Sequence, residues 1–293
     1  MNTLLSRIWK NREAYLWMLP AICLVIFSTV YPFIFSIDYS LWKTEIFQKQ
    51  RFVWFDNYLK LFQDERFWQN VLNSAFFTFF GILFSIGIGF TLAVLLRRKS
   101  RLNAMYRTII LVPWVTNEVV LGLLWIWLLN PQMSPVYYLF DSIGLPLPNF
   151  FDNQTLALWT VTLVNAWRSL GFSLVMMLAA LSAIPSEVEE SAEIDGCRPF
   201  KKLWHIIIPL VRPTTQVMII VLTISFFNIV ALVLTMTGGG PIYSTEILSI
   251  RLYKEGFLFF NIQTASALTT IMLVINLFLA WIYMKLISSE GYY

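Results

Sequence analysis

Residues 190–197 of this 293-residue chain read ESAEIDGC, and residues 206–209 read IIIP. The first stretch is polar and acidic, whereas long and mostly apolar segments lie on both sides of it, at about residues 155–183 and 206–235. Each of these segments is long enough to cross the hydrocarbon core of a bilayer as a helix. We therefore interpret the polar stretch as a loop that lies in water between two membrane spans.

The composition also indicates a membrane protein. Hydrophobic residues make up 58% of the chain and charged residues only 13%, about half the charged share of a soluble domain. The formal net charge of +4 could suggest a nucleic-acid partner. The basic residues flank apolar segments instead, which favours a role in membrane topology. We therefore predict no nucleic-acid partner. Cys23 and Cys197 lie in an apolar segment and in the polar stretch, so no disulfide framework is predicted.

Six segments carry the roughly 20 apolar residues that a membrane span needs. Backbone groups in lipid must be bonded within the segment, so each is predicted to be a helix. The first segment is too long for the apolar core of a signal peptide, so it is predicted to remain as a span. We predict an all-α polytopic membrane protein with six transmembrane helices, at about residues 14–37, 70–96, 107–129, 155–183, 206–235 and 264–286.

The placement of Lys and Arg predicts the orientation. Of the 21 such residues, 13 lie on one side of the predicted membrane and 7 on the other, with Arg168 inside a span. The richer side includes Arg7 and Lys10 near the N-terminus and the loop of residues 185–209. Because Lys and Arg collect in cytoplasmic loops, both termini and this loop are predicted to be cytoplasmic.

The loop is predicted to contain a short helix at about residues 187–195. Pro185 ends the helical register of the preceding span. Ser186, with Glu189 three residues later, fits a capping box. Gly196 is a suitable residue to end the helix.

A second short helix is predicted from Pro199 to a break at Pro209, with Lys201 and Lys202 facing water. At the end of the first helix, Glu193 and Asp195 are mildly unfavourable with the helix dipole unless something basic meets them. A solvated acidic loop is the ordinary explanation of such a charge run. The regular spacing of the whole stretch favours a more specific explanation of these acidic residues, namely a binding role.

The loop resembles the EAA…DGA…LP coupling loop of ABC importer permeases, with its spacing intact as far as Pro213. In that family the loop forms the helix by which the membrane subunit docks onto an ATPase subunit. The resemblance implies that Glu190 pairs with a basic residue of the ATPase. Ser191 and Cys197 stand where the family usually has Ala, and both are small. The coupling residues that the resemblance implies are Glu190, Ser191, Ala192, Ile194, Asp195 and Gly196.

Further stretches resemble the carbohydrate-type members of this family, and together they cover nearly the whole chain. Trp54 stands where these members usually have Gly. The stretches are MLP at 18–20, YP at 31–32, FVWFDNY at 52–58, FW at 67–68, LVPW at 111–114, TGGGP at 237–241 and STE at 244–246.

This resemblance implies a type I, maltose-permease-like fold with a cytoplasmic coupling helix. Residues 1–69 would form an N-terminal span and outer segment, and residues 70–293 the core permease domain, with the coupling loop at 185–209. The implied partners are a second permease subunit in a heterodimer, two ATPase subunits and an extracytoplasmic solute-binding protein. The implied function is uptake of a sugar, polyol or glycerol phosphate across a bacterial-type inner membrane by alternating access.

Motifs for catalysis are missing from the sequence. A Walker A loop ends in Gly-Lys-Ser/Thr, and no Lys in this chain follows a Gly. His205 is the only His, which excludes an HExxH metal site, and no GxSxG occurs. We therefore predict no enzyme activity, no metal and no cofactor in this chain, with ATP and Mg bound by the partner ATPase.

Two charges lie at similar depth in neighbouring predicted spans, Glu118 and Arg168. Charges near the bilayer centre are costly and usually face a cavity or a partner. They either line the translocation pathway, as a pair, or form a purely structural pair between helices. Amides and indoles nearby could bind hydroxyls or stack on sugar rings, although aromatic packing is the ordinary role of a Trp. These further candidates are Asn117, Asn165, Asn228, Trp114, Trp125 and Trp167.

Three other functions remain open at this point. A secondary transporter driven by an ion gradient needs ionisable groups in its spans, and two are present. That function leaves the acidic loop unexplained. A polytopic membrane enzyme is disfavoured because catalytic motifs are missing. An ABC permease for a non-sugar solute is disfavoured by the stretches that resemble carbohydrate-type members.

Overall fold

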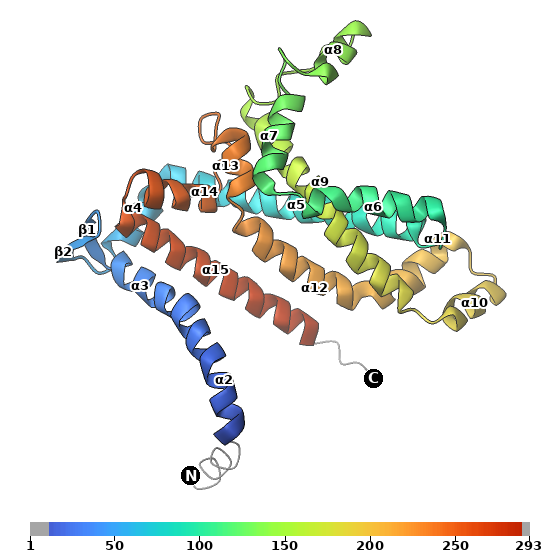
Figure 1. Ribbon diagram of the computed structural model, residues 1–293, viewed down its shortest axis with the longest axis horizontal. Helices are drawn as coiled ribbons and strands as arrows, with labels where there is room; N and C mark the ends of the chain where they lie inside the picture. Colours follow the sequence, from blue (N-terminus) through green and yellow to red (C-terminus); the bar gives the residue numbers. More distant parts are fainter. Residues whose placement is uncertain (1–11, 289–293) are drawn as a thin grey trace. The chain divides into compact units, whose positions relative to one another are not determined.

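The computed structural model describes residues 12–288, and this part of the chain is helical apart from one β-hairpin (Figure 1). Arg7 and Lys10, which contribute to the predicted orientation, lie outside the described residues. The elements are α2 (Arg12–Val25), η1 (Ile26–Val30), α3 (Tyr31–Ser40), β1 (Trp42–Glu45), β2 (Gln48–Phe52), α4 (Asp56–Gln63), α5 (Glu65–Leu96), α6 (Arg101–Val115), α7 (Glu118–Leu128), α8 (Pro135–Ser142), α9 (Gln154–Ser182), α10 (Ser186–Ile194), α11 (Pro199–Lys202), η2 (Leu203–Ile207), α12 (Ile208–Phe227), α13 (Ala231–Thr237), α14 (Leu248–Tyr253), η3 (Lys254–Leu258) and α15 (Ile262–Ser288), where η marks a π-helical turn.

The membrane spans agree with the all-α polytopic prediction. Five helical segments of the described chain are long and apolar enough to cross a bilayer, and a sixth is counted if the bent pair α6 and α7 is one span. The five are Leu16–Ser40, Glu65–Leu96, Gln154–Ser182, Pro199–Phe227 and Ile262–Lys285.

Two predicted spans are interrupted. The prediction of one helix at 107–129 is wrong, because α6 and α7 meet at an angle of 103°. The backbone is extended at Thr116 and Asn117, and the Asn117 side chain accepts a bond from the amide of Val119 at 2.9 Å. Asn is a good N-cap residue, so it begins a new helix here. The predicted span at 206–235 is also too long, because α12 ends at Phe227 and α13 begins only at Ala231.

The chain forms two compact units. The first comprises the residues up to Gln63 together with Lys254–Val274, and the second comprises Asp64–Tyr253 together with the residues from Ile275. In the first unit, β1 and β2 pair antiparallel with Trp42 opposite Phe52. The backbone amide of Thr44 donates to the side chain of Gln263 at 2.7 Å, which ties this hairpin to the start of α15. The division predicted at residue 70 stays a prediction.

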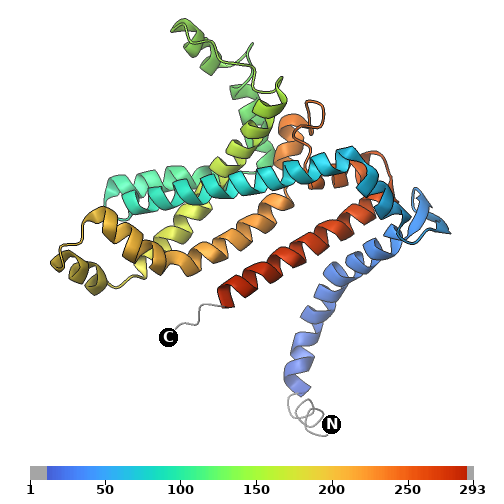
Figure 2. The ribbon, with the colours of Figure 1, turned by 180° about the vertical axis from the view of Figure 1, so that it is seen from behind.

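The second unit is built around α5, α9 and α12, which pack against one another, and Figure 2 shows α9 crossing α5. Small residues let α5 and α9 approach closely: a Cβ on Gly89 would lie 2.5 Å from the Cβ of Ser173. One turn away, the hydroxyls of Ser85 and Ser173 are 2.9 Å apart. Such contacts are typical of helix pairs in membranes, where close packing replaces the hydrophobic effect. Two apolar clusters, around the buried Phe226 and Met218, fill the space between these helices.

Candidate functional site

The helix predicted within the polar loop is present. It was expected at about 187–195, and α10 spans Ser186–Ile194. Gly196 ends it with φ +72°. The amide of Gly196 donates to the carbonyl of Glu193 at 3.0 Å, and that of Cys197 donates to the carbonyl of Ala192 at 2.9 Å. These two bonds form a Schellman motif, which confirms the predicted stop.

The start of α10 differs from the prediction. Pro185 occupies the N-cap position and no side chain caps the helix, so the capping box of Ser186 and Glu189 is wrong. The carboxylate of Glu189 is instead bound by Arg97, which follows the last residue of α5. A bidentate bond to a guanidinium is much stronger than one to a backbone amide, so it decides where the carboxylate lies.

Four side chains form what we call the Glu189 clamp: Arg97, Glu189, Glu193 and Lys202. Arg97 donates to both oxygens of Glu189, with Nη1–Oε1 at 2.9 Å and Nη2–Oε2 at 2.6 Å. The Lys202 ammonium lies 3.3 Å from the Glu189 carboxylate and 2.8 Å from that of Glu193. Hydrogen bonding from Arg97 holds the pKa of Glu189 below its ordinary value.

The contacts of Lys202 and Glu193 bear on two predictions, of which one is wrong and one is confirmed. Lys202 was expected to face water, yet its side chain is only 12% exposed, whereas Lys201 is exposed as predicted. Glu193 was expected to need a basic neighbour at the end of the helix, and Lys202 provides it. The clamp therefore holds α10 against both the end of α5 and the start of the following helix.

The residues of α10 outside the clamp present a free surface. Glu190 is exposed, and within residues 12–288 it has no hydrogen bond or ion pair through its side chain. Ile194, one turn further on, is 86% exposed, and Asp195 is exposed beside it. Ala192 is buried on the inner face of the helix, and the hydroxyl of Ser191 bonds to the carbonyl of Glu187 at 2.6 Å. An exposed acid next to an exposed apolar side chain is suited to a protein partner.

The chain after α10 does not break at Pro209. The helical segment runs continuously from Pro199 to Phe227, through α11, the π-turn η2 and α12. Pro209 follows directly after the π-turn η2. A local π-helical adjustment lets a continuous membrane helix accommodate a proline, so the predicted break is wrong.

Three of the predicted pathway residues lie together. Arg168 on α9 and Glu118 on α7 form an ion pair with Nη2–Oε1 at 2.9 Å, and their side chains are 12% and 31% exposed. The Nε of Arg168 also donates to the Oδ1 of Asn165 at 3.4 Å. Asn165 is fully buried, and within residues 12–288 its Nδ2 has no hydrogen-bond partner. A buried amide donor without a partner is costly, which makes this group a candidate for binding an oxygen of a solute.

The other predicted pathway residues make contacts of their own. The Asn117 side chain caps α7, and the Asn228 amide donates to the carbonyl of Ile224 at 2.7 Å. Trp114 packs on Phe172 with ring centroids 5.8 Å apart. Trp125 and Trp167 meet edge to face with ring centroids 5.4 Å apart, and the buried Trp125 Nε1 has no hydrogen-bond partner in the part of the chain that the structure describes.

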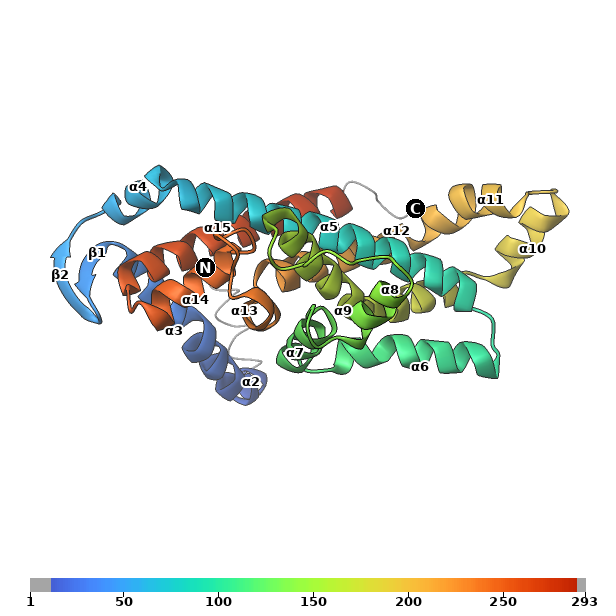
Figure 3. The same ribbon diagram turned by 90° about the horizontal axis from the view of Figure 1, so that it is seen from above.

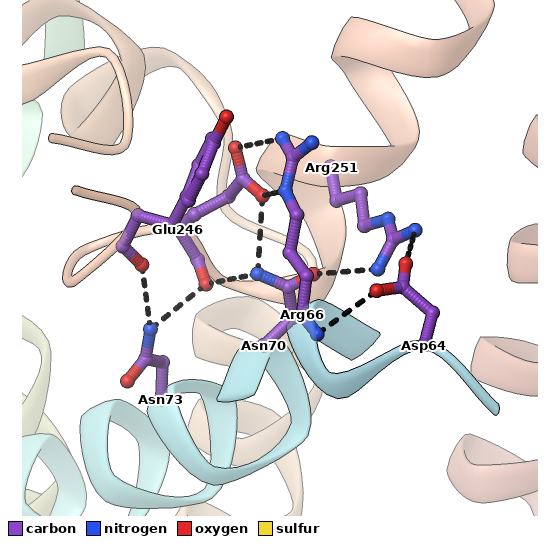
Figure 4. Close-up of polar contacts among 7 residues, drawn as sticks. Asp64, Arg66, Asn70, Asn73, Glu246 and Arg251 are labelled. Atoms are coloured by element: carbon purple, nitrogen blue, oxygen red, sulfur yellow. Dashed lines mark hydrogen bonds and ion pairs between the residues drawn. The ribbon is translucent and has the colours of Figure 1, made fainter. Parts of the chain in front are cut away.

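The structure also contains a buried polar network that the sequence did not predict (Figure 4). Glu246 is fully buried, and Arg66 donates to both its carboxylate oxygens at 2.8 Å. Asn70 donates to the backbone oxygen of Glu246 at 2.9 Å and to its carboxylate at 3.1 Å. Its members, from the first turns of α5 and the region of residues 246–251, are Asp64, Arg66, Asn70, Asn73, Glu246 and Arg251.

The network fixes the segment between α13 and α14, which we call the α13–α14 connection (residues 238–247). Asn73 donates to the backbone oxygens of Tyr243 and Glu246 at 3.0 and 3.1 Å. The Arg66 guanidinium lies 3.9 Å from the ring centre of Tyr243, a cation–π distance. Gly238 ends α13 in the left-handed region. Nothing in the local sequence of this connection indicates that Glu246 is buried.

Within residues 12–288, no group of three or more His, Cys, Asp or Glu side chains is placed to hold a metal ion. The described chain combines apolar helices long enough to span a membrane with an exposed acidic helix, α10, between two of them.

The chain belongs to the binding-protein-dependent transport system inner membrane component family, whose model matches residues 85–288. This family membership makes it a transport protein of the inner membrane rather than a member of a catalytic family, as predicted.

Relatives with curated names match almost end to end. The sn-glycerol-3-phosphate transport system permease protein UgpA of Agrobacterium fabrum is 29% identical over 282 residues, covering 95% of this chain and 96% of the relative. The protein of the same name from Yersinia pseudotuberculosis is 25% identical and covers 95% of both chains.

Solved structures share the fold. A chain of a bacterial alginate ABC transporter, crystallised with an alginate pentasaccharide-bound periplasmic protein, matches with a TM-score of 0.83 and 20% identity, covering 95% of this chain and 94% of that one. A chain of the methionine ABC transporter MetNI matches less well, with a TM-score of 0.52 over 76% of this chain. The predicted ABC importer permease fold is thereby confirmed.

Proposed function

We propose that this chain is the permease subunit of an ATP-driven importer and that α10 is its coupling helix. The observation that carries the proposal is the arrangement of α10: Glu189 and Glu193 are held within the chain, while Glu190 and Ile194 are left exposed. A partner with a basic residue beside an apolar hollow would fit this surface. A charge-assisted hydrogen bond to Glu190 would contribute about 1.5–3 kcal/mol to docking.

The proposed assembly contains a second, related permease, two ATPase subunits and a solute-binding protein. ATP and Mg are bound by the ATPases, because no phosphate-binding loop is present in this sequence. The distribution of Lys and Arg supports a topology with both termini and α10 in the cytoplasm. Movement of α10 would then rock the helix bundle and alternate access to the pathway.

The proposed solute is a sugar or a related polyol or glycerol phosphate. Support comes from relatives named for sn-glycerol-3-phosphate transport and from a structural neighbour named for alginate. Within the spans, the ion pair of Arg168 and Glu118 and the Nδ2 of Asn165, which has no hydrogen-bond partner in the described residues, offer donors and acceptors to a hydroxylated solute. We propose that this group lines the pathway.

The coupling role is tested by reversing one charge on the exposed face of α10. Glu190→Lys should abolish solute uptake in membrane vesicles while the permease remains inserted in the membrane. Glu13→Lys, at an exposed acid of α2 and therefore outside the surface of α10, is the matched control for the change in net charge and should keep most of the uptake. Normal ATP-dependent uptake with Glu190→Lys would refute the proposal.

A further inference from the structure

Helix α5 is fastened at both of its ends by ion pairs. It spans 32 residues without a proline, so its hydrogen-bond ladder is unbroken over about 48 Å. The Glu189 clamp lies at its C-terminal end and the buried polar network at its N-terminal end. Figures 1 and 3 show α14 beside the N-terminal part of this helix and α10 beyond its C-terminal end.

The attachment at the C-terminal end is local and strong. Arg97 follows Leu96, the last residue of α5, and its guanidinium makes both bonds to Glu189. The neighbouring Arg98 is exposed and has no ion pair within residues 12–288. Arg97 is therefore the side chain that bonds α5 directly to α10, while the other connections run indirectly, through Lys202 and through α9, which precedes α10 in the chain.

At the N-terminal end, three successive turns of α5 grip the α13–α14 connection. Arg66, Asn70 and Asn73 all bond to residues of this connection. The tip of the connection stays outside: Ile242 is 73% exposed and Tyr243 is 44% exposed. The connection is thus bound to α5 through its base while its tip can meet another molecule.

The middle of α5 gives it little freedom to bend separately. Gly89 packs against Ser173 of α9, and Gly81 packs directly under the ring of Phe226 of α12. Contacts this close leave no space between the helices in which a displacement could be absorbed. An α-helix packed in this way at Gly81 and Gly89 and fastened at both ends moves as one body.

We propose that α5 is a rigid strut that carries the displacement of α10 to the α13–α14 connection at the opposite end of the helix. The inference rests on the proposed function, since it takes ATPase binding to α10 as the source of the displacement. It adds a route inside this chain by which the nucleotide state is felt at the tip residues Ile242 and Tyr243. Arg97 and Arg66 are the positioning residues of the strut.

The experiment follows the tip while nucleotide is added to the assembled transporter. Cys23 and Cys197 are replaced by Ala, and Ile242→Cys provides one reactive thiol at the exposed tip. The rate of maleimide labelling is measured in detergent-purified complex, without binding protein, with and without a non-hydrolysable ATP analogue and Mg. Coupling between sites commonly changes equilibria by roughly fivefold or more, so the analogue should change the labelling rate by roughly that factor.

Arg97→Gln should remove this response while the ATPase still co-purifies with the permease. Arg98→Gln, which removes the same charge one residue away, should keep the response. An equal response in Arg97→Gln and the parent, a loss of the response in both glutamine variants, or no response in the parent complex would each overturn the strut. If Arg97→Gln releases the ATPase, Arg66→Gln at the far end decides: a lost response supports the strut and a retained response overturns it.

Failure of the proposed function gives a different result. In that case no ATPase co-purifies with the parent chain, and the labelling assay has no nucleotide-binding partner. Failure of the strut alone leaves a complete complex whose tip does not respond through Arg97.

Discussion

Trp54 has a φ of +51°, in the left-handed region of the backbone. Its sequence position is one where the carbohydrate-type permeases that this chain resembles usually have Gly. A bulky side chain is disfavoured in this region by roughly 1–2 kcal/mol, because its Cβ crowds the backbone. The Trp54 ring packs edge to face on Phe52 at 4.8 Å, a contact that returns about 0.5–1.5 kcal/mol.

Two substitutions at Trp54 separate these contributions. Trp54→Ala deletes the contact with Phe52 and keeps the unfavourable φ, whereas Trp54→Gly deletes the contact and relieves the backbone. We expect the Gly variant to be more stable than the Ala variant by about 1 kcal/mol. The measurement is the midpoint of thermal unfolding of the purified chain in detergent. An Ala variant as stable as the Gly variant would show that φ is not strained here.

The pair of Arg168 and Glu118 has two possible roles, in the pathway or in helix packing. The single variants Arg168→Ala and Glu118→Ala each leave one charge unpaired, so both should lower uptake. The double variant Glu118→Gln with Arg168→Gln removes both charges and leaves no unpaired ion. If the pair contacts solute, uptake by the correctly inserted double variant should fall about tenfold or more, the loss expected for a charge-assisted bond. Unchanged uptake in both single variants would exclude the pathway role.

At the scale of elements, α10 was predicted to within one residue at each end, and its contacts were not. The helix end follows from Gly196 and the next few residues, which are local features. The capping box was also predicted from local sequence, and it does not form because Arg97, 92 residues away, binds the Glu189 carboxylate instead. The bend between α6 and α7 is the opposite case, because a local signal for it was present in the sequence. Asn117 is a good N-cap residue, but it lies inside an apolar run that hydropathy alone predicts to be one span.

The stability that the Glu189 clamp contributes should fall in acid and stay constant at neutral pH. The pKa of Glu189 is lowered in the folded chain, chiefly by the hydrogen bond from Arg97. A group with a lowered folded-state pKa contributes stability above its unfolded pKa and loses it as the pH falls through the folded value. The contribution should therefore be constant from about pH 8 to about pH 5 and decline only in stronger acid.

Glu189→Gln provides the comparison, since it lacks the titrating group. The difference in thermal midpoint between the parent chain and this variant should be flat above about pH 5 and narrow below about pH 4. A difference that disappears on going from about pH 8 to about pH 6 would show that the clamp carboxylate titrates elsewhere.

At the scale of the whole molecule, the buried network shows how charge is tolerated within a membrane protein. Glu246 is fully buried, whereas the side chain of Arg66 is 25% exposed. Removing Arg66 leaves a buried carboxylate with the amide of Asn70 as a remaining donor. Removing the charge of Glu246 leaves an arginine that can still reach water.

This asymmetry gives a stability prediction. Arg66→Ala should destabilise the chain by about 3–5 kcal/mol, the cost of breaking a buried ion pair from one side. Glu246→Gln should cost less. Lys60→Ala, which removes an exposed partner of Asp56 in α4, is the control and should cost about 0.5 kcal/mol or less. The measurement is the midpoint of thermal unfolding of each variant. The prediction would be contradicted if Glu246→Gln had the lowest midpoint of the three.

The sequence by itself determined that this is a helical membrane permease of the binding-protein-dependent kind, with α10 between two spans. It could do so because hydropathy, helix stops and the spacing of the coupling loop are written in consecutive residues. Only the tertiary structure decided which charges are held and which are free. Glu189 is bound by Arg97, 92 residues away, and Glu246 by Arg66, 180 residues away. Both arginines reach these partners because α5 packs against helices that are distant in the sequence. Burial and geometry of that kind depend on the whole fold, and no short stretch of the chain encodes them.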